Sequence, residues 1–488
     1  ICLSVSDNKR YQRTENQHPI LGFEYQPNES SLTELYFQKM GLQVRYFMPP
    51  NSAAPLAFYY VGDLLNDYTG LELISTISTM ETFQKIYRPE IYNANAAAGQ
   101  HYQPNWQLSR VVLRKSILSS HTNAFLSNGL PATLTNSDKS PFLMKKLLPT
   151  STAGSLPKPA WLAQPETLWS PWKLQDQELI EGKQDALRIS LQEQLQAGID
   201  IVSDGEQTRQ HFVTTFIEHL DGVDFEKRET VRIRDRYDAS VPTVVGAVAR
   251  QKPVFVEDAR FLRAQTSQPI KWALPGPMTM IDTLFDAHYK SREKLAWEFA
   301  KILNQEAREL EAAGVDIIQF DEPAFNVFFD EVNDWGIATL ERAIEGLKCE
   351  TAVHICYGYG IKANTDWKKT LGSEWRQYEE AFPKLQKSNI DLISLECHNS
   401  QVPMDLLELI RGKKVMVGAI DVATDIIETP EQVASTLRKA LQFVDADKLY
   451  PCTNCGMAPL SRSVARGKLN ALSAGAEIIR KELVNQPS

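Results

Sequence analysis

The chain lacks the features that mark membrane, secreted and nucleic-acid-binding proteins. None of its apolar runs approaches the roughly 20 residues that a membrane-spanning helix needs. Its 488 residues include only six scattered cysteines, which do not make a disulfide framework. The net charge of −9 offers no general basic surface for nucleic acid. The first residues, ICLSV, are followed at once by polar residues and show no signal peptide. We therefore expect a cytoplasmic protein that binds neither membrane nor nucleic acid.

A segment rich in Ser, Thr, Asn and Pro divides the chain into two parts. Residues 117–143 break the periodicity of helices and strands, and they predict a linker. Residues 1–116 carry strand-like apolar runs at 43–48 and 56–61, which predict a mixed α/β accessory unit. Residues 144–488 then form a second domain, as the length of the chain also favours.

The second part alternates apolar runs with helix-like segments. Leucines recur every four residues from Leu187 to Leu195, and Gly198 suits a cap at the end of this helix. Eight apolar runs predict strands at residues 147–152, 199–203, 270–274, 315–320, 351–356, 392–395, 415–420 and 449–452. This repetition predicts an α/β fold, a (β/α)8 TIM barrel preceded by the smaller mixed α/β unit. Residues 207–269 are an excursion, in which 227–236 predict an exposed strand.

Metal-binding residue types end three of the predicted strands. Because the active sites of TIM barrels lie at the C-terminal ends of the strands, these residues are expected to meet. His354 and Cys356 are two apart on one predicted strand, so their side chains leave the same face. Glu396 ends the next strand, and Cys455 follows the last one. Zinc accepts Cys, His and Glu ligands in nearly tetrahedral geometry, so the four residues predict a zinc site that activates a thiol.

Two other interpretations of these cysteines stay open. A His-x-Cys pair taken alone is often a buried core pair, and it is Glu396 and Cys455 that favour a metal here. Cys452 and Cys455 form a Cys-x-x-Cys, which redox proteins also use. The chain shows no thioredoxin pattern around this pair, which weighs against the redox interpretation.

Three further residues at strand ends suit a zwitterionic ligand. Glu206 and Asp321 end the second and fourth predicted strands and supply negative charge for a substrate ammonium. Ser155 and the backbone amides after Gly154 suit a carboxylate. Beside a zinc ion these groups predict an amino acid that carries a thiol. Surface salt bridging is the alternative role for the two carboxylates.

The motifs at the strand ends resemble those of one enzyme family. They are AGSLP (153–157), DGE (204–206), PGP (275–277), IQFDEPA (318–324), HICYG (354–358), ISLE (393–396) and NCG (454–456). Over about residues 145–485 the chain resembles the catalytic C-terminal barrel of cobalamin-independent methionine synthase. The resemblance implies methyl transfer to the thiol of L-homocysteine to give L-methionine. It assigns zinc to the four predicted metal ligands and homocysteine to the three residues above.

The chain departs from that family on the side of the methyl donor. Family members carry an Asn-Trp pair that contacts the folate pterin, where this chain has Asp282 and Thr283. The proton-donating His of the family lies two residues after Asp421, where this chain has Ala423. Asp421 is the catalytic candidate at this strand end. Residues 1–143 do not resemble the family's second barrel, so the likeness is to the short core type. The donor stays open between methyltetrahydrofolate and a methyl-corrinoid protein.

Residues 1–141 resemble part of another family, the DUF1852 type. The motifs TISTMETFQK (76–85) and YRPEIYN (87–93) carry this resemblance, which implies an accessory or methyl-supply unit joined to its synthase. Other functions stay open for the whole chain. They are a zinc methyltransferase for another small thiol, a uroporphyrinogen-decarboxylase-like relative, and a non-catalytic subunit that binds zinc or a partner.

Overall fold

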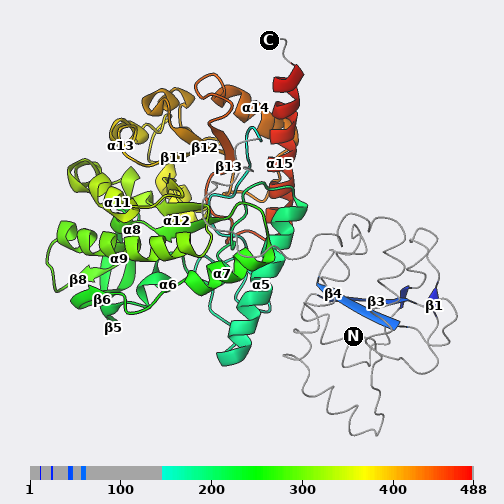
Figure 1. Cartoon of the computed structure of the whole chain (residues 1–488), viewed down its shortest axis with the longest axis horizontal. Coiled ribbons are helices and arrows are strands. Elements are labelled where there is room, and N and C mark those ends of the chain that lie inside the picture. The colour runs from blue at the N-terminus through cyan, green and yellow to red at the C-terminus, as the bar shows by residue number, and fades with distance from the viewer. Residues whose placement is uncertain (1–10, 13–23, 26–41, 48–55, 62–145, 486–488) are drawn as a thin grey trace, which may run out of the picture. The chain divides into compact units, whose positions relative to one another are not determined.

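The computed structural model describes residues 11–12, 24–25, 42–47, 56–61 and 146–485 (Figure 1). The chain divides into two compact units, Ile1–Ser137 and Asp138–Ser488. The predicted linker at residues 117–143 lies outside the described residues, so the predicted domain bounds stay a prediction.

The described residues of the first unit form two antiparallel strand pairs. β1 (Tyr11–Gln12) pairs with β2 (Glu24–Tyr25), and β3 (Leu42–Phe47) pairs with β4 (Leu56–Val61). β3 and β4 confirm the strands predicted from the apolar runs at 43–48 and 56–61. β3 begins and ends one residue earlier than predicted.

A six-stranded parallel sheet is the centre of the second unit, with the order β13-β12-β11-β10-β9-β7. Its strands are β7 (Lys271–Pro275), β9 (Ile317–Asp321), β10 (Glu350–His354), β11 (Leu392–Glu396), β12 (Lys414–Ile420) and β13 (Leu449–Thr453). They are short, mostly apolar and almost wholly buried, as in parallel sheets that are covered on both faces. Six of the eight predicted strands are thereby confirmed.

The first two predicted strands make single bridges instead of full ladders. Ser151 pairs in parallel with Ile201, and Val202 pairs in parallel with Ile270, next to β7. The Ser151 N–H also donates to the Pro451 carbonyl of β13 at 3.0 Å. Backbone hydrogen bonds therefore run from one edge strand of the sheet, through both segments, to the other edge strand.

Helices lie around the outside of this sheet (Figure 1). They are α5 (Asp176–Gln196), α6 (Thr214–Ile217), α7 (Val256–Gln265), α8 (Pro277–Ile281), α9 (Arg292–Ala312), α10 (Phe329–Glu331), α11 (Ile337–Ile344), α12 (Lys362–Lys368), α13 (Tyr378–Leu385), α14 (Pro430–Ala440) and α15 (Arg462–Asn485). Two 3-10 helices, η2 (Pro323–Asn326) and η4 (Met404–Ile410), and one π-helix, η3 (Val332–Gly336), add to these in the described residues. Gly198 follows α5 with a φ of +77°, which confirms the predicted glycine cap. In the described part of the chain, no helix has both the length and the apolarity to cross a membrane.

Two sets of buried side chains hold the second unit together. The larger packs the helices against the sheet. The smaller is separate from it and consists of side chains from β9 to β13 and from the bridge residue Ile201. They are Ile201, Ile317, Ala352, Leu392, Met416, Tyr450 and Cys452. Because strand side chains alternate between faces, the smaller set lies on the face of the sheet that the helices do not cover.

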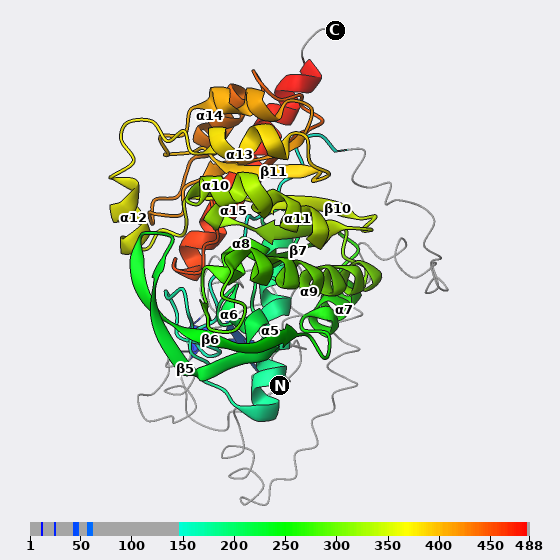
Figure 2. The same ribbon diagram turned by 90° about the vertical axis from the view of Figure 1, so that its left-hand side faces the viewer.

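A long hairpin interrupts the alternation of strands and helices. β5 (Asp221–Ile233) pairs antiparallel with β6 (Tyr237–Ala249), and β8 (Phe285–Asp286) lies beside β6. Figure 2 shows the hairpin curving along one side of the unit toward α12. β5 confirms the strand predicted at residues 227–236 as far as Ile233, and most of its side chains are exposed, although Ile233 is buried. The prediction is wrong at the turn, where Arg234 is buried.

Gly276 joins β7 to α8 at a place that has no room for a side chain. A Cβ atom there would lie 2.2 Å from the carboxyl carbon of Glu322. This carboxylate accepts hydrogen bonds from the N–H groups of Met278 and Thr279, at 3.0 and 2.9 Å, at the start of α8. We expect Gly276→Ala to displace it and to lower the free energy of unfolding by about 2 kcal/mol. Denaturation followed by circular dichroism measures this.

Gly246→Ala is the matched control. Gly246 lies on β6, and the nearest heavy atom to a Cβ built there is at 3.8 Å, an ordinary contact. The control should change the stability by less than about 0.5 kcal/mol. Equal losses in the two variants would contradict the role given to the Glu322 carboxylate.

Candidate metal and substrate site

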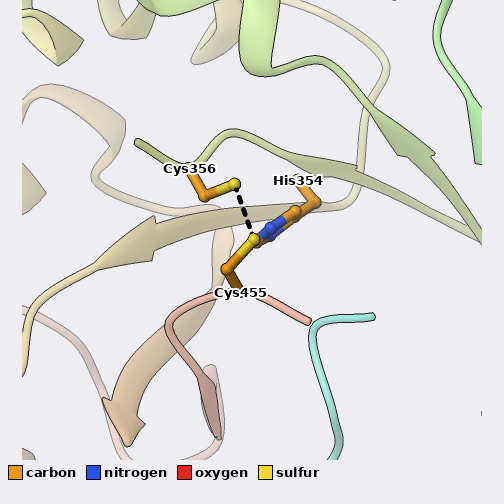
Figure 3. Close-up of side chains that lie close together, drawn as sticks. All are labelled: His354, Cys356 and Cys455. Atoms are coloured by element: carbon orange, nitrogen blue, oxygen red, sulfur yellow. Dashed lines mark hydrogen bonds between the residues drawn. The ribbon is translucent and has the colours of Figure 1, made fainter. Parts of the chain in front are cut away.

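Three metal-binding side chains meet at the C-terminal end of the sheet (Figure 3). His354 ends β10, Cys356 follows it, and Cys455 lies in the loop after β13. The imidazole nitrogen and the two Sγ atoms all lie within 4.8 Å of one another, and all three residues are buried. The strand predicted to run to Cys356 is too long, since β10 ends at His354. Cys356 is therefore brought to the site by the turn after the strand, and not by strand alternation.

The ring of His354 has one nitrogen that is held and one that is free. Its Nδ1 lies 2.6 Å from Ser394 Oγ on the neighbouring strand β11. Its Nε2 is buried and has no hydrogen-bond partner. Leaving a buried polar atom unpaired costs about 1–3 kcal/mol, and a metal ion bound to Nε2 would remove that cost. The donor set, one imidazole nitrogen and two sulfur atoms, fits a metal of the kind predicted.

The two sulfur atoms lie within hydrogen-bonding distance of each other. Cys356 Sγ and Cys455 Sγ are 3.1 Å apart, and both cysteines are free. The hydrogen bond from Cys455 holds the pKa of the Cys356 thiol well below its usual value, and His354 acts in the same direction. Burial raises the pKa of the Cys455 thiol, and the neighbouring Cys356 adds to this rise. This shift favours the thiolate of Cys356, the form in which cysteine binds metals. Cys452, the other half of the possible redox pair, packs instead in the apolar cluster on the sheet.

Glu396, the fourth predicted ligand, does not belong to this group of three. Its carboxylate accepts a hydrogen bond from Lys368 Nζ at 2.6 Å, and another from the Tyr357 N–H at 3.3 Å. Burial raises the pKa of Glu396, and Lys368 opposes the rise. To become a metal ligand, this carboxylate would have to exchange Lys368 for the ion. Its role as a ligand stays a prediction.

Two buried carboxylates lie close to the metal-binding group. Asp321 lines the same cavity as His354, and its Oδ1 accepts a hydrogen bond from Gln319 Nε2 at 2.7 Å. Burial raises the pKa of Asp321 to about 6, although His354 opposes this shift. Burial also raises the pKa of Glu206 to about 7, against the influence of Arg209. Glu206 Oε1 is buried without a partner, so a cationic ligand would supply a hydrogen bond that the protein leaves unmade.

Ser155 is buried at the same end of the sheet. Its Oγ lies 3.3 Å from the hydroxyl of Tyr359, which lines the cavity together with Gly456. A Cβ atom on Gly456 would come within 2.5 Å of Ser155 Oγ, so glycine is needed there for space. Tyr359 was not predicted as a site residue. Tyr359 lies two residues after Tyr357 in the loop that follows β10, and this position was the available signal.

Asp421, predicted as catalytic, does not line this cavity. Its Oδ1 accepts a hydrogen bond from the Ala423 N–H at 2.8 Å, and its Oδ2 accepts one from Asn399 Nδ2 at 3.3 Å. Both bonds shape the loop that follows β12. The catalytic role of Asp421 stays a prediction.

The chain matches two known families and several known proteins. The family described as "Cobalamin-independent synthase, Catalytic domain" matches residues 148–477, and the family described as "Putative oxygenase MesX" matches residues 1–118. A methionine synthase from Sulfurisphaera tokodaii is 32% identical over 342 residues, which are 70% of this chain and 95% of that protein. One from Saccharolobus solfataricus is 30% identical over 341 residues, which are 69% of this chain and 96% of that protein.

A solved structure is also similar. It is a B12-independent methionine synthase from Shewanella sp. W3-18-1 in complex with selenomethionine, and it is 87% identical to this chain. The match has a TM-score of 0.69 and covers 70% of this chain and 100% of the Shewanella chain.

The bond between Ser394 and His354 can be tested by mutation. We expect Ser394→Ala to free the imidazole ring and to weaken binding of a divalent metal by about 10- to 100-fold, as loss of such supporting bonds does elsewhere. Titration with Co2+, followed by its visible absorption, measures this affinity. Ser388→Ala is the control, since Ser388 Oγ bonds the Leu385 carbonyl at the end of α13. Equal affinities in the two variants would contradict the role of Ser394.

Proposed function

The chain belongs to the cobalamin-independent methionine synthase family through its catalytic domain, and from this premise we propose that it methylates the thiol of L-homocysteine to form L-methionine. The observation that carries the proposal is the buried group of His354, Cys356 and Cys455 beside two buried carboxylates. The 87% identical Shewanella protein binds selenomethionine, the selenium analogue of the product, which supports an amino-acid site of the same kind.

Zinc is the metal that we propose for this site. Tetrahedral zinc takes nitrogen and sulfur ligands, and His354, Cys356 and Cys455 offer one nitrogen and two sulfur atoms. When bound, zinc supplies the positive charge that keeps a substrate sulfur deprotonated at neutral pH. Glu396 is the fourth ligand in this proposal, after release from Lys368.

The protein's own residues bind and orient the amino acid. Glu206 and Asp321 receive the ammonium group, and Ser155 receives the carboxylate. Gln319 fixes the orientation of Asp321, and Lys271 Nζ donates in turn to Gln319 Oε1. Because all five side chains are buried, ligand binding excludes water, and the charged contacts gain strength in the low-dielectric interior.

We propose that the sheet of the second unit closes into the predicted (β/α)8 TIM barrel within residues 144–488. The hydrogen bond from Ser151 to β13 and the bridges to β7 support closure. Residues 1–116 are proposed as an accessory unit and 117–143 as a linker, and the match of residues 1–118 to a separate family supports a division there. A cytoplasmic location stays a prediction.

The carboxylate pair favours homocysteine over a thiol without an ammonium group. A zinc methyltransferase for another small thiol and a non-catalytic zinc-binding subunit are the alternatives. Zinc-loaded protein should bind L-homocysteine with release of about one proton as the thiolate forms. It should then form methionine from a suitable donor, with methyltetrahydrofolate and methylcobalamin as the first two to assay. Failure to bind homocysteine would overturn the proposal.

Loss of a metal ligand should abolish both zinc binding and methionine formation. We expect His354→Ala and Cys455→Ser each to lower zinc affinity by more than about a hundredfold, since a zinc site of four ligands cannot spare a donor. Zinc retained after dialysis against a chelator measures this. Cys452→Ser is the control, because Cys452 is equally buried but packs in the apolar cluster. Full activity in either ligand variant would show that the site is wrongly assigned.

Affinity for L-methionine should rise with pH as Glu206 ionises. Its pKa is raised to about 7, so the carboxylate is protonated at pH 6 and binds an ammonium poorly. The ionised fraction of Glu206 grows from about one tenth at pH 6 to about nine tenths at pH 8, which predicts about ninefold tighter binding from Glu206 alone. Asp321, with a pKa of about 6, adds to the rise. Isothermal titration calorimetry measures the affinity. Glu206→Gln should bind weakly at both pH values, and an unchanged pH dependence would remove Glu206 from this role.

A further inference from the structure

Two arginines from the turn of the β5–β6 hairpin line the same cavity as the metal-binding group. They are Arg234 and Arg236, and the cavity also contacts His354, Cys356 and Cys455. Figure 2 shows how the curved hairpin carries this turn to the neighbourhood of α12. Neither arginine has a part in the proposed binding of homocysteine, whose ammonium and carboxylate are already assigned to other residues.

Arg236 is held firmly, yet more than half of its N–H donors are unused. Its Nη1 donates to the Tyr357 carbonyl at 3.1 Å and to Asn364 Oδ1 at 3.2 Å. Its guanidinium carbon lies 3.7 Å from the centre of the Trp367 ring. Its Nε and Nη2 are buried and have no hydrogen-bond partner. Contacts on one side therefore fix the guanidinium and leave its other N–H groups for a ligand.

Arg234 is more deeply buried and also incompletely paired. Its Nε lies 3.6 Å from Asp282 Oδ2, which is close enough for charge attraction but too far for a hydrogen bond. Both of these atoms are buried without a hydrogen-bond partner. Asp282 thus offsets part of the positive charge of the two arginines and leaves their donors unsatisfied.

His211 adds a neutral donor to this part of the cavity. Its Nδ1 accepts the N–H groups of Val213 and Thr214, at 3.4 and 3.3 Å, so the ring proton sits on Nε2. Burial lowers the pKa of His211 to about 3, and the nearby Arg234 and Lys158 lower it further. The ring is therefore uncharged at physiological pH and can only donate through Nε2.

We propose that Arg234, Arg236 and His211 form a subsite for an anionic group, a carboxylate or a phosphate, on the methyl donor. Guanidinium groups bind both anions through paired N–H donors, and a buried anion would supply the partners that these nitrogens lack. The inference rests on the proposed function, because it assigns the arginines to the second substrate. The competing role is structural, in which Arg236 only ties the hairpin turn to the loop before α12.

The test measures anion binding with the amino-acid site already filled. Full-length protein loaded with zinc and saturated with L-methionine is titrated by calorimetry with inorganic phosphate, with succinate, and with uncharged succinamide. We expect millimolar or tighter binding of at least one anion and none of succinamide. Binding of phosphate alone indicates a phosphate-bearing donor, and binding of succinate alone indicates a carboxylate. Absence of anion binding, with methionine bound normally, overturns the subsite and leaves the proposed function intact.

Variants then separate ligand binding from a structural role. Arg234→Gln and Arg236→Gln should each weaken anion binding by about tenfold or more, as loss of a charged hydrogen bond does. Arg232→Gln is the matched control, since Arg232 lies on the same hairpin but is exposed and pairs with Asp238. Equal losses in the control, or no loss in both test variants, would overturn the proposal.

Folding of each variant is checked by its binding of zinc and methionine. If a glutamine variant loses these as well, Arg236→Lys replaces it, since lysine keeps the charge. The lysine variant should keep measurable anion binding, and complete loss with methionine binding intact would contradict the subsite. Failure of the unmutated protein to bind zinc and methionine would instead overturn the proposed function, and the subsite with it.

Discussion

The hydrogen bond between Ser394 and His354 is the interaction on which the rest of the site depends. The two residues face each other in the parallel register of β10 and β11, so the sheet itself aligns them. With Nδ1 held at 2.6 Å, the ring has only Nε2 to offer to a metal, and the ring lies beside two sulfur atoms that are 3.1 Å apart. Glu396 comes two residues after Ser394 and leaves the same face of β11. One register therefore positions the imidazole and the carboxylate together.

Sequence periodicity located two of the predicted site residues at the ends of strands, where the structure also has them. His354 and Glu396 end buried apolar strands. The C-terminal ends of parallel strands all lie at the same edge of the sheet, so the two residues are expected there together. Cys356 was predicted correctly as a neighbour but for the wrong reason, because it follows the strand and reaches the site through a turn. The ion pair of Lys368 with Glu396 could not be predicted, since nothing in the local sequence of α12 fixes where that helix lies.

The β5–β6 hairpin also shows that local sequence predicts an element but not its position in the fold. Alternating charges in residues 227–233 predict a strand with a solvated face, and β5 is such a strand. Burial of Arg234 depends instead on the position of the turn. That position is set by the two 13-residue strands on either side of it. The predicted barrel has a similar weakness at its start. Apolar composition identified the segment around Ser151, but the length of a strand depends on its pairing partners. Ser151 makes one bridge on one side and one backbone hydrogen bond on the other.

The unpaired buried atoms of this protein reveal more about its chemistry than its paired ones. Most polar groups in a folded interior have partners, and each one that does not costs about 1–3 kcal/mol. Around this cavity the exceptions are of two kinds. His354 Nε2 and Glu206 Oε1 lack a cation or donor, whereas Arg234 Nε and the Nε and Nη2 of Arg236 lack an acceptor. The two kinds require ligand groups of opposite charge. In the proposed function a metal ion and the substrate ammonium satisfy the first kind. Because the substrate carboxylate is assigned there to Ser155, the second kind is left for an anionic group of the methyl donor.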